Sequence, residues 1–207
     1  MRAVLVANPK GGAGKTTIAT NLAGAFARRN QRVVLWDLDR QRSSLNWLSM
    51  RPGDRPAIDR LGRKDGEDKP PRGADWLILD SPAGLHGKNL GYAVKLADKI
   101  VVPVQPSLFD MEATGSFLQA LLDEKAVRKQ RAAVGIVGVR VDPRTRAAST
   151  LEAFLAQFEI PVLTYLRDTQ VYVNAAFNGL TIFDLPEYIS GRDVEQWQAL
   201  LEWVDGA

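Results

Sequence analysis

Short apolar stretches alternate with helix-patterned stretches along nearly the whole chain, and this alternation limits the possible folds. In the helical stretches apolar residues share one face, as Ile18, Leu22 and Phe26 do. The apolar stretches are continuous, as in strands buried on both faces. We therefore predict an α/β fold with one mostly parallel, twisted sheet and helices on both faces. The expected strands are residues 3–7, 32–37, 76–80, 99–104, 134–139 and 160–166, and the expected helices are residues 15–29, 88–97, 111–124, 145–158, 172–178 and 193–204.

The length of 207 residues suits one domain with a full core, so we predict a single domain over residues 1–207. Residues 51–75 interrupt the alternation. They are rich in proline, glycine and charge, with seven basic and six acidic residues. We expect this segment to be a mobile connection and not a domain boundary.

The composition excludes several classes of protein. The chain has no cysteine, which excludes disulfides, thiolate metal sites and iron–sulfur clusters and is compatible with a reducing cytoplasm. No apolar run approaches the roughly 18 residues that a membrane-spanning helix needs. The formal net charge is only +3, so a polyanionic partner would have to bind a local basic patch.

The clearest motif follows the first expected strand and opens the first expected helix. Its glycines let the backbone approach phosphate oxygens, and the N–H groups at the start of a helix bind anions. Lys15 is expected to reach the β- and γ-phosphates, and the Thr16 hydroxyl is expected to bind Mg²⁺. The pattern predicts a P-loop NTPase that binds ATP or GTP. The motif residues are Lys10, Gly11, Gly12, Ala13, Gly14, Lys15, Thr16 and Thr17.

One departure from the usual P-loop motif limits the class of P-loop protein to which this chain is similar. Pro9 stands where the first glycine is usual, and Lys10 is a second lysine. This signature resembles the ParA/MinD family of deviant Walker A ATPases, and residues 103–107 and 170–173 resemble segments of short plasmid-type ParA partition proteins. The resemblance implies ATP with Mg²⁺, a homodimer in the ATP state, and a Lys10 that reaches the ATP of the partner chain as an arginine finger does.

Carboxylates end two of the expected strands, and ligands bind beyond the carboxyl ends of parallel strands. Asp37 and Asp39 lie in a D-x-D-x-Q pattern, with Arg40 where the family usually has proline. The resemblance implies that Asp39 orients the attacking water and that Asp37 supports the magnesium shell. Asp80 ends an apolar run in the Walker B pattern and is expected to hold Mg²⁺ through water. Residues 81–84 would form a second switch, with Gly84 as its hinge.

The base site is less sharply defined. The asparagine of the guanine-reading N-K-x-D pattern is absent, so guanine is not predicted. Asp142 is expected to cap the helix that follows it. The resemblance implies that the segments around Arg140 and Asp168 border adenine.

Residues 125–146 contain seven basic residues and one acidic residue, and such a patch is able to contact DNA phosphates without reading sequence. The alternative is a set of solvated ends of helices and strands. The family's use of nucleoid DNA favours DNA contact. The residues predicted to contact DNA are Arg128, Lys129, Arg131, Arg144 and Arg146.

The last expected helix carries an apolar stripe that includes Val194, Trp197, Leu201 and Val204. Some family members end in a membrane-binding amphipathic helix, which is normally basic because anionic lipid attracts it. Residues 190–207 instead hold one basic and four acidic residues. We therefore expect the stripe to pack on the core, and we expect no membrane partner.

Together these features predict a weak, partner-stimulated ATP hydrolase that is cytoplasmic and nucleoid-associated. An ATP-dependent dimer would bind DNA nonspecifically, and a small adaptor protein would stimulate hydrolysis. Its cargo would be a plasmid or chromosome, or a protein body such as a carboxysome or a chemoreceptor cluster. The alternatives are a MinD-like membrane-cycling spatial regulator and an ATP-dependent metabolic ligase on the same scaffold, although such ligases lack the lysine at Lys10.

Overall fold

The computed structural model describes residues 1–62 and 70–206. All strands in this part of the chain lie in one sheet, in the order β3-β2-β4-β1-β5-β6-β7, and every neighbouring pair is parallel. The predicted α/β architecture is therefore confirmed. The strands are β1 (Arg2–Val6), β2 (Val33–Asp37), β3 (Asp59–Gly62), β4 (Trp76–Asp80), β5 (Lys99–Val104), β6 (Ala133–Gly138) and β7 (Val162–Tyr165).

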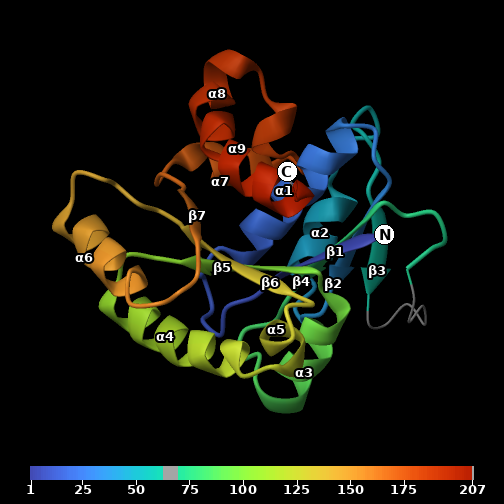
Figure 1. The fold of residues 1–207 in the computed structure, drawn as a ribbon. Helices are drawn as coiled ribbons and strands as arrows, with labels where there is room; N and C mark the ends of the chain where they lie inside the picture. Colours follow the sequence, from blue (N-terminus) through green and yellow to red (C-terminus); the bar gives the residue numbers. More distant parts are fainter. Residues whose placement is uncertain (63–69, 207) are drawn as a thin grey trace.

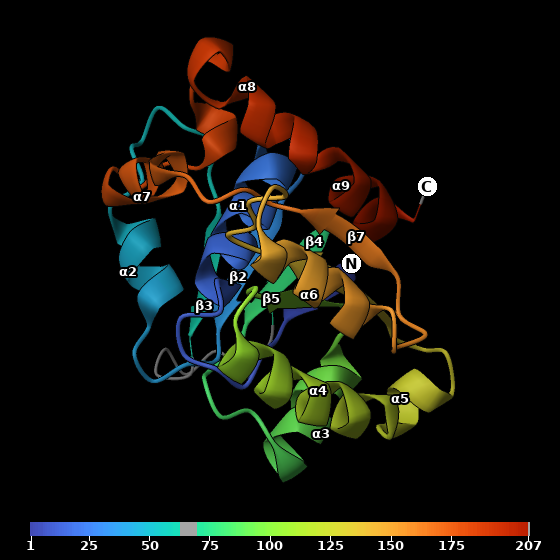
Figure 2. The ribbon, with the colours of Figure 1, turned by 90° about the vertical axis from the view of Figure 1, so that its left-hand side faces the viewer.

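Helices cover both faces of the sheet (Figures 1 and 2). One layer contains α3 (Gly87–Leu96), α4 (Leu108–Leu122), α5 (Lys125–Arg128) and α6 (Arg146–Leu155). The other layer contains α1 (Lys15–Arg28), α2 (Ser43–Ser49), α7 (Gln170–Phe177), the 3-10 helix η1 (Ile182–Asp184), α8 (Glu187–Gln196) and α9 (Gln198–Asp205).

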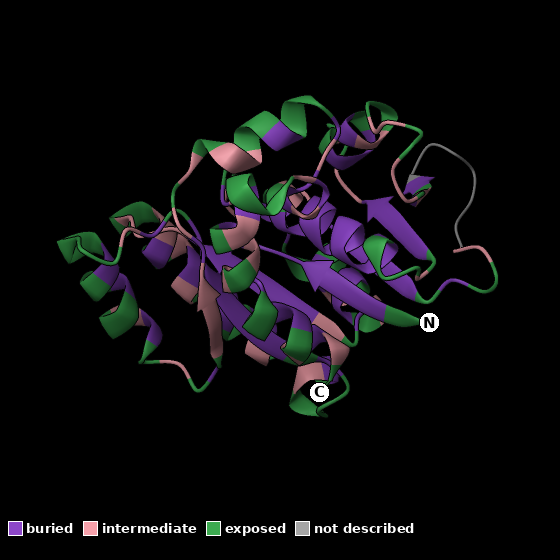
Figure 3. Cartoon of the chain, turned by 90° about the horizontal axis from the view of Figure 1, so that it is seen from above, coloured by how far each residue is buried: buried purple, intermediate pink, exposed green. Residues whose placement is uncertain are grey.

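The inner strands are almost wholly buried because each face of the sheet carries its own apolar core, whereas the edge strands β3 and β7 are partly exposed (Figure 3). Trp76 illustrates how the α1 layer is held: it is fully buried and stacks on Phe26 with ring centroids 4.1 Å apart. Burial on both faces explains why the strands are continuous apolar runs without polar alternation.

The strand register sets where polar side chains emerge. In neighbouring strands Val6 pairs with Asp80, and Asp37 also pairs with Asp80. The residues that follow β1, β2 and β4 therefore leave the sheet at the same edge, which is where the functional motifs lie.

Four elements of the described chain were not predicted from the sequence: β3, α2, the short helix α5 and the 3-10 helix η1. Residues 59–62, inside the segment expected to be a mobile connection, form the edge strand β3 beside β2, so the expectation is wrong for them; residues 63–69 lie outside the described residues. Helix α2 also escaped prediction, because its seven residues are too few for a periodic pattern. The last expected helix is two helices, α8 and α9, which meet at Trp197.

The C-terminal apolar stripe faces the interior of the protein. Trp197 is fully buried, and Leu201 and Val204 are exposed by only 6% and 2%. This confirms that the stripe packs on the core. In the described part of the chain, no helix has the length and apolar character needed to cross a membrane.

A helical glycine tests this packing. A Cβ added to Gly24 in α1 would lie 2.4 Å from the Thr181 side chain, which is itself buried. Gly24→Ala should therefore lower the melting temperature, although alanine favours a helix by roughly 1 kcal/mol. Gly191→Ala in α8 is the control, because its Cβ would meet only the flexible Glu187 side chain at 3.2 Å. Thermal unfolding of both variants measures the difference, and equal melting temperatures would contradict this close approach.

Candidate nucleotide-binding site

The P-loop joins β1 to α1 in the manner that phosphate binding requires. Gly12 and Gly14 have φ angles of 76° and 85°, a left-handed backbone that glycine adopts without strain. Gly14 is the N-cap residue of α1, and no side chain caps this helix end. The N–H groups at the start of α1 are therefore available to an anion.

The Lys15 side chain lies folded back onto the loop. The residue is 8% exposed, and its Nζ donates a hydrogen bond to the Lys10 carbonyl oxygen at 2.7 Å. Burial lowers the pKa of Lys15, while the nearby carboxylates of Asp80 and Asp39 act in the opposite direction. A buried ammonium without an ion-pair partner is costly, so an incoming phosphate would stabilise it.

Asp80 lies beside Thr16, as the motif order predicts. The Thr16 hydroxyl donates to Oδ2 of Asp80 at 2.8 Å, whereas Oδ1 is buried and has no hydrogen-bond partner. Burial raises the pKa of Asp80 to about 7. A carboxylate and a hydroxyl are oxygen ligands of the kind Mg²⁺ prefers, and the free oxygen fits a direct or water-mediated bond to the ion.

Asp37 and Asp39 differ although only one residue separates them. Both oxygens of Asp37 are engaged, because Oδ1 accepts the Asp39 N–H and Oδ2 accepts the N–H and hydroxyl of Ser44 at 3.0 and 2.7 Å. Asp37 therefore holds the start of α2, and any role in the magnesium shell would be indirect. Asp39 is only partly buried, and it lies close enough to affect the pKa of Lys15.

Residues outside the motif fix the loop. Asn8 is fully buried; its amide donates to Pro103 O and to Thr114 Oγ1, and its Oδ1 accepts the Lys10 N–H. Gly84 N donates to Pro9 O at 2.8 Å, which joins the expected second switch to the P-loop. Asn8 was not predicted from the sequence. The feature that could have indicated it is the presence of a polar residue directly after a buried apolar strand.

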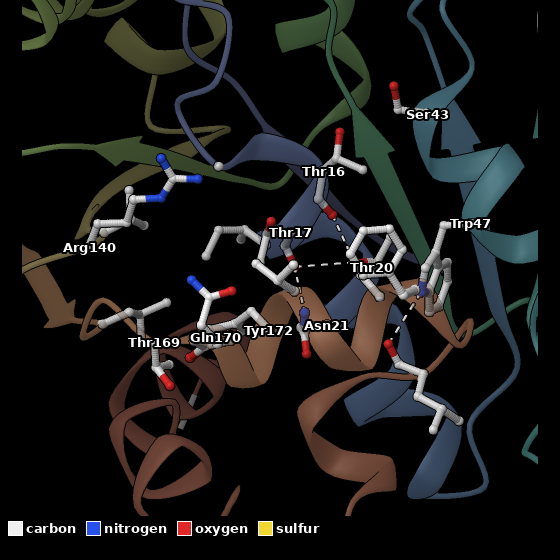
Figure 4. A pocket seen from close by; sticks show the side chains of 18 of the residues that line it. Thr16, Thr17, Thr20, Asn21, Ser43, Trp47, Arg140, Thr169, Gln170 and Tyr172 are labelled. Carbon is white, nitrogen blue, oxygen red and sulfur yellow. Dashed lines mark hydrogen bonds between the residues drawn. The ribbon is translucent and has the colours of Figure 1, made fainter.

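A cavity of about 790 Å³ opens beside the P-loop (Figure 4). Thr16 and Thr17 of the P-loop line it, and Arg140 and Asp168 line it as well. The structure thus brings both predicted base-site residues to the cavity that contains the P-loop threonines. Arg140 has a φ of 55°, and a left-handed conformation in a residue other than glycine is often found at functional sites.

The sequence model of the CobQ/CobB/MinD/ParA nucleotide binding domain family matches residues 4–182. The chain belongs to this family. The match includes the P-loop, Asp39, Asp80 and Arg140, and the cavity beside the P-loop is the candidate nucleotide site of this domain.

Named relatives of the chain cover most of its length. Maintenance of carboxysome distribution protein A of Gloeobacter kilaueensis is 32% identical over 195 residues, covering 87% of this chain and 83% of the relative. The chromosome-partitioning ATPase Soj of Thermus thermophilus is 30% identical over 189 residues, covering 75% and 76%. An ATP complex of McdA from Cyanothece has a similar fold, with a TM-score of 0.77, 14% identity and coverage of 100% and 96%.

The basic residues predicted to contact DNA do not form one patch in this ParA/MinD-family domain. Arg128, Lys129 and Arg131 precede β6, whereas Arg144 and Arg146 follow it, at the other end of a six-residue strand. Such a strand is roughly 20 Å long. In addition, the Arg144 guanidinium is paired with Asp142 at 2.9 Å, and this hydrogen-bonded pair lowers the pKa of Asp142 to about 2. The basic residues expected to form a single patch thus lie in two separate clusters, and their contact with DNA stays a prediction.

Asp80→Asn tests the electrostatics of the site. The folded pKa of about 7 lies above the ordinary value of 3.8, so the ionised carboxylate destabilises the fold, and this destabilisation is complete above pH 7. We expect the nucleotide-free variant to melt a few degrees higher than the parent protein at pH 8, since about 1 kcal/mol shifts the midpoint of a domain this size by roughly 2–4 °C. The difference should vanish near pH 4.

Asp37→Asn is the matched control, because Asp37 is also buried but accepts hydrogen bonds through both oxygens. Its amide cannot accept all of these bonds, so this variant should melt lower at every pH. Thermal unfolding from pH 4 to 8 compares the two. A lower melting temperature for Asp80→Asn at pH 8 would contradict the assignment of a destabilising buried charge.

Proposed function

We propose that this protein is a ParA-type ATPase that uses ATP-dependent dimerisation to position or segregate a cargo. The observation that carries the proposal is the P-loop geometry, with the buried, unpaired Lys15 ammonium and the free oxygen of Asp80 at one edge of the sheet. Mg²⁺-ATP would supply phosphate oxygens to the Lys15 ammonium and a metal ion to the Asp80 carboxylate. Bound Mg²⁺ would draw negative charge away from the β- and γ-phosphates.

Lys10 is the residue through which two copies of the chain would share the proposed site. Its backbone is fixed by Asn8, but within residues 1–62 and 70–206 its ammonium makes no hydrogen bond or ion pair. The nearby Lys15 already supplies the cation of its own loop. We assign Lys10 to the phosphates of a second copy, where it would neutralise charge that develops during transfer.

Hydrolysis in this scheme depends on Asp39. It lies in the loop after β2, where it is partly exposed and near Lys15, so its carboxylate is available to hold and orient a water. Asp37 would keep this loop in place through the start of α2. Loss of the γ-phosphate would release the loops that carry Asp39 and Gly84, and the dimer would open.

The proposed track is DNA, which would make the protein cytoplasmic and nucleoid-associated. Arg128, Lys129 and Arg131 are exposed, and α5 packs against α3, which carries the exposed Lys88 and Lys95. A small adaptor on the cargo would stimulate hydrolysis. The relatives named for carboxysome distribution and for chromosome partitioning support a positioning role and leave both kinds of cargo as candidates.

Two substitutions test the ATP switch. Asp39→Ala should trap an ATP-bound dimer with ATPase activity reduced at least about tenfold, because a water-orienting group typically contributes 10²–10⁴-fold. Lys10→Ala should bind ATP but remain monomeric. Light scattering after size exclusion, with ATP or ADP, and steady-state ATPase assays with and without DNA measure both.

Lys95→Ala, which removes an exposed lysine of α3 on the proposed DNA-binding surface, is the control for dimerisation alone and should dimerise as the parent protein does. Identical dimerisation and DNA retention with ADP and ATP would reject the switch. ATP-dependent sedimentation with liposomes would favour a membrane track in place of DNA.

The two basic clusters can be separated by charge reversal. Glutamate at Arg128, Lys129 and Arg131 should weaken DNA retention of the ATP dimer and lower its salt dependence, because fewer counterions are released. Glutamate at Arg144 and Arg146 is the matched comparison at the other end of β6. Filter binding across a salt series identifies the contacting cluster, and unchanged binding in both variants would exclude both surfaces.

A further inference from the structure

One wall of the cavity consists of two loop segments joined to each other. Leu166 N donates to Gly138 O at 2.7 Å, and Val141 N donates to Leu166 O at 3.0 Å. These bonds fix the segment after β7, which carries Asp168, to the segment after β6, which carries Arg140. The two residues expected to border the base therefore belong to one connected wall.

This wall is held from behind by the C-terminal helices. Arg167 forms a two-bond ion pair with Asp193 of α8, at 2.6 and 2.9 Å, and the Asp193 side chain is fully buried. The Arg167 N–H also donates to Gln196 Oε1 at 3.1 Å, and Thr164 Oγ1 donates to Gln196 O at 2.7 Å. The C-terminal helices lie beside β7 and α7 (Figure 1).

A second contact acts at the other end of the same segment. Trp197 Nε1 donates to the Tyr172 hydroxyl at 2.9 Å. Thr169, Gln170 and Tyr172 line the cavity between these two attachments (Figure 4). Residues 167–172 are therefore attached to the C-terminal helices at both ends, while their middle faces the cavity.

Packing alone does not account for an ionic contact here. A buried ion pair costs desolvation energy that often equals its attraction, so apolar side chains would stabilise this position as well. The planar guanidinium does fix a direction and a distance, because both of its bonds to Asp193 must be satisfied at once. An ion pair of this kind suits the positioning of a binding wall.

We infer that Asp193 and Gln196, acting through Arg167, are positioning residues that set the base-binding wall of the nucleotide site. The inference rests on the proposed nucleotide function, and it assigns the C-terminal helices a part in recognising the base. The P-loop binds the triphosphate independently of this wall. Loss of the ion pair should therefore weaken binding of ATP without weakening binding of a bare polyphosphate chain.

The test compares Asp193→Asn with Asp184→Asn. Asp184 is a matched control: its side chain is also fully buried and forms a two-bond ion pair, with Arg51 at 2.9 and 3.3 Å, but neither partner lines the cavity. Isothermal titration with ATP and with inorganic tripolyphosphate, both with Mg²⁺, gives two dissociation constants for each protein. Melting temperatures report the loss of stability, which should be at least as large for Asp184→Asn, because Asp184 also accepts hydrogen bonds from the N–H and hydroxyl of Thr181 at 2.8 and 2.7 Å.

We expect Asp193→Asn to bind ATP about tenfold more weakly, a loss well above the error of the titration, with tripolyphosphate binding within about twofold of the parent protein. Asp184→Asn should leave both constants unchanged. Gln196→Ala keeps the buried ion pair and should show a smaller, several-fold loss for ATP alone, which provides the test if Asp193→Asn does not fold.

Equal ATP affinity in the parent protein and in Asp193→Asn would overturn the inference while leaving the proposed function intact. A parallel loss for ATP and tripolyphosphate would also overturn it, because that pattern indicates general damage to the site. If the parent protein binds no Mg²⁺-ATP, or if Lys15→Ala binds it equally well, the proposed function fails, and the inference fails with it.

Discussion

The parallel register of β1, β4 and β2 is the constraint on which the site depends. It brings the ends of these strands to one edge of the sheet. The P-loop, Asp80 and the loop after Asp37 therefore lie together, although they are far apart in the sequence. The register is itself fixed by burial, because strands covered on both faces cannot slip without exposing apolar side chains. The apolar cores therefore set the geometry of the charged groups.

The charged groups at this edge are arranged for a ligand more than for stability. Lys15 is buried and bonded only to a carbonyl oxygen, and one oxygen of Asp80 has no partner. Asp37, which lies next to Asp80 in the register, shows the opposite arrangement, with both oxygens hydrogen-bonded. The site thus separates one carboxylate that holds the loop from another that is free to bind a metal ion, and sequence spacing could not distinguish the two.

The C-terminal helices contact both the apolar core and the segment proposed to bind the base. Their apolar stripe packs on the core, and their polar residues Asp193 and Gln196 reach the segment that follows β7. A helix pair that closes the fold therefore also supports the wall of the nucleotide cavity. This dual contact explains how an acidic C-terminal segment can matter to nucleotide binding without touching the phosphates.

The sequence by itself determined the α/β fold, most strand positions and the P-loop, and it indicated Lys10, Lys15, Asp39 and Asp80 as candidate site residues, because apolar runs and glycine-rich loops have strong local signals. Only the tertiary structure decided what depends on contacts between distant segments. Strand β3 forms because β2 offers it an edge, Asn8 is important because Pro103 and Thr114 surround it, and the basic residues of 125–146 separate because β6 runs between them. The sequence gives the charge of each residue and its spacing along the chain, but the packing of the strands sets how far apart those residues lie in space.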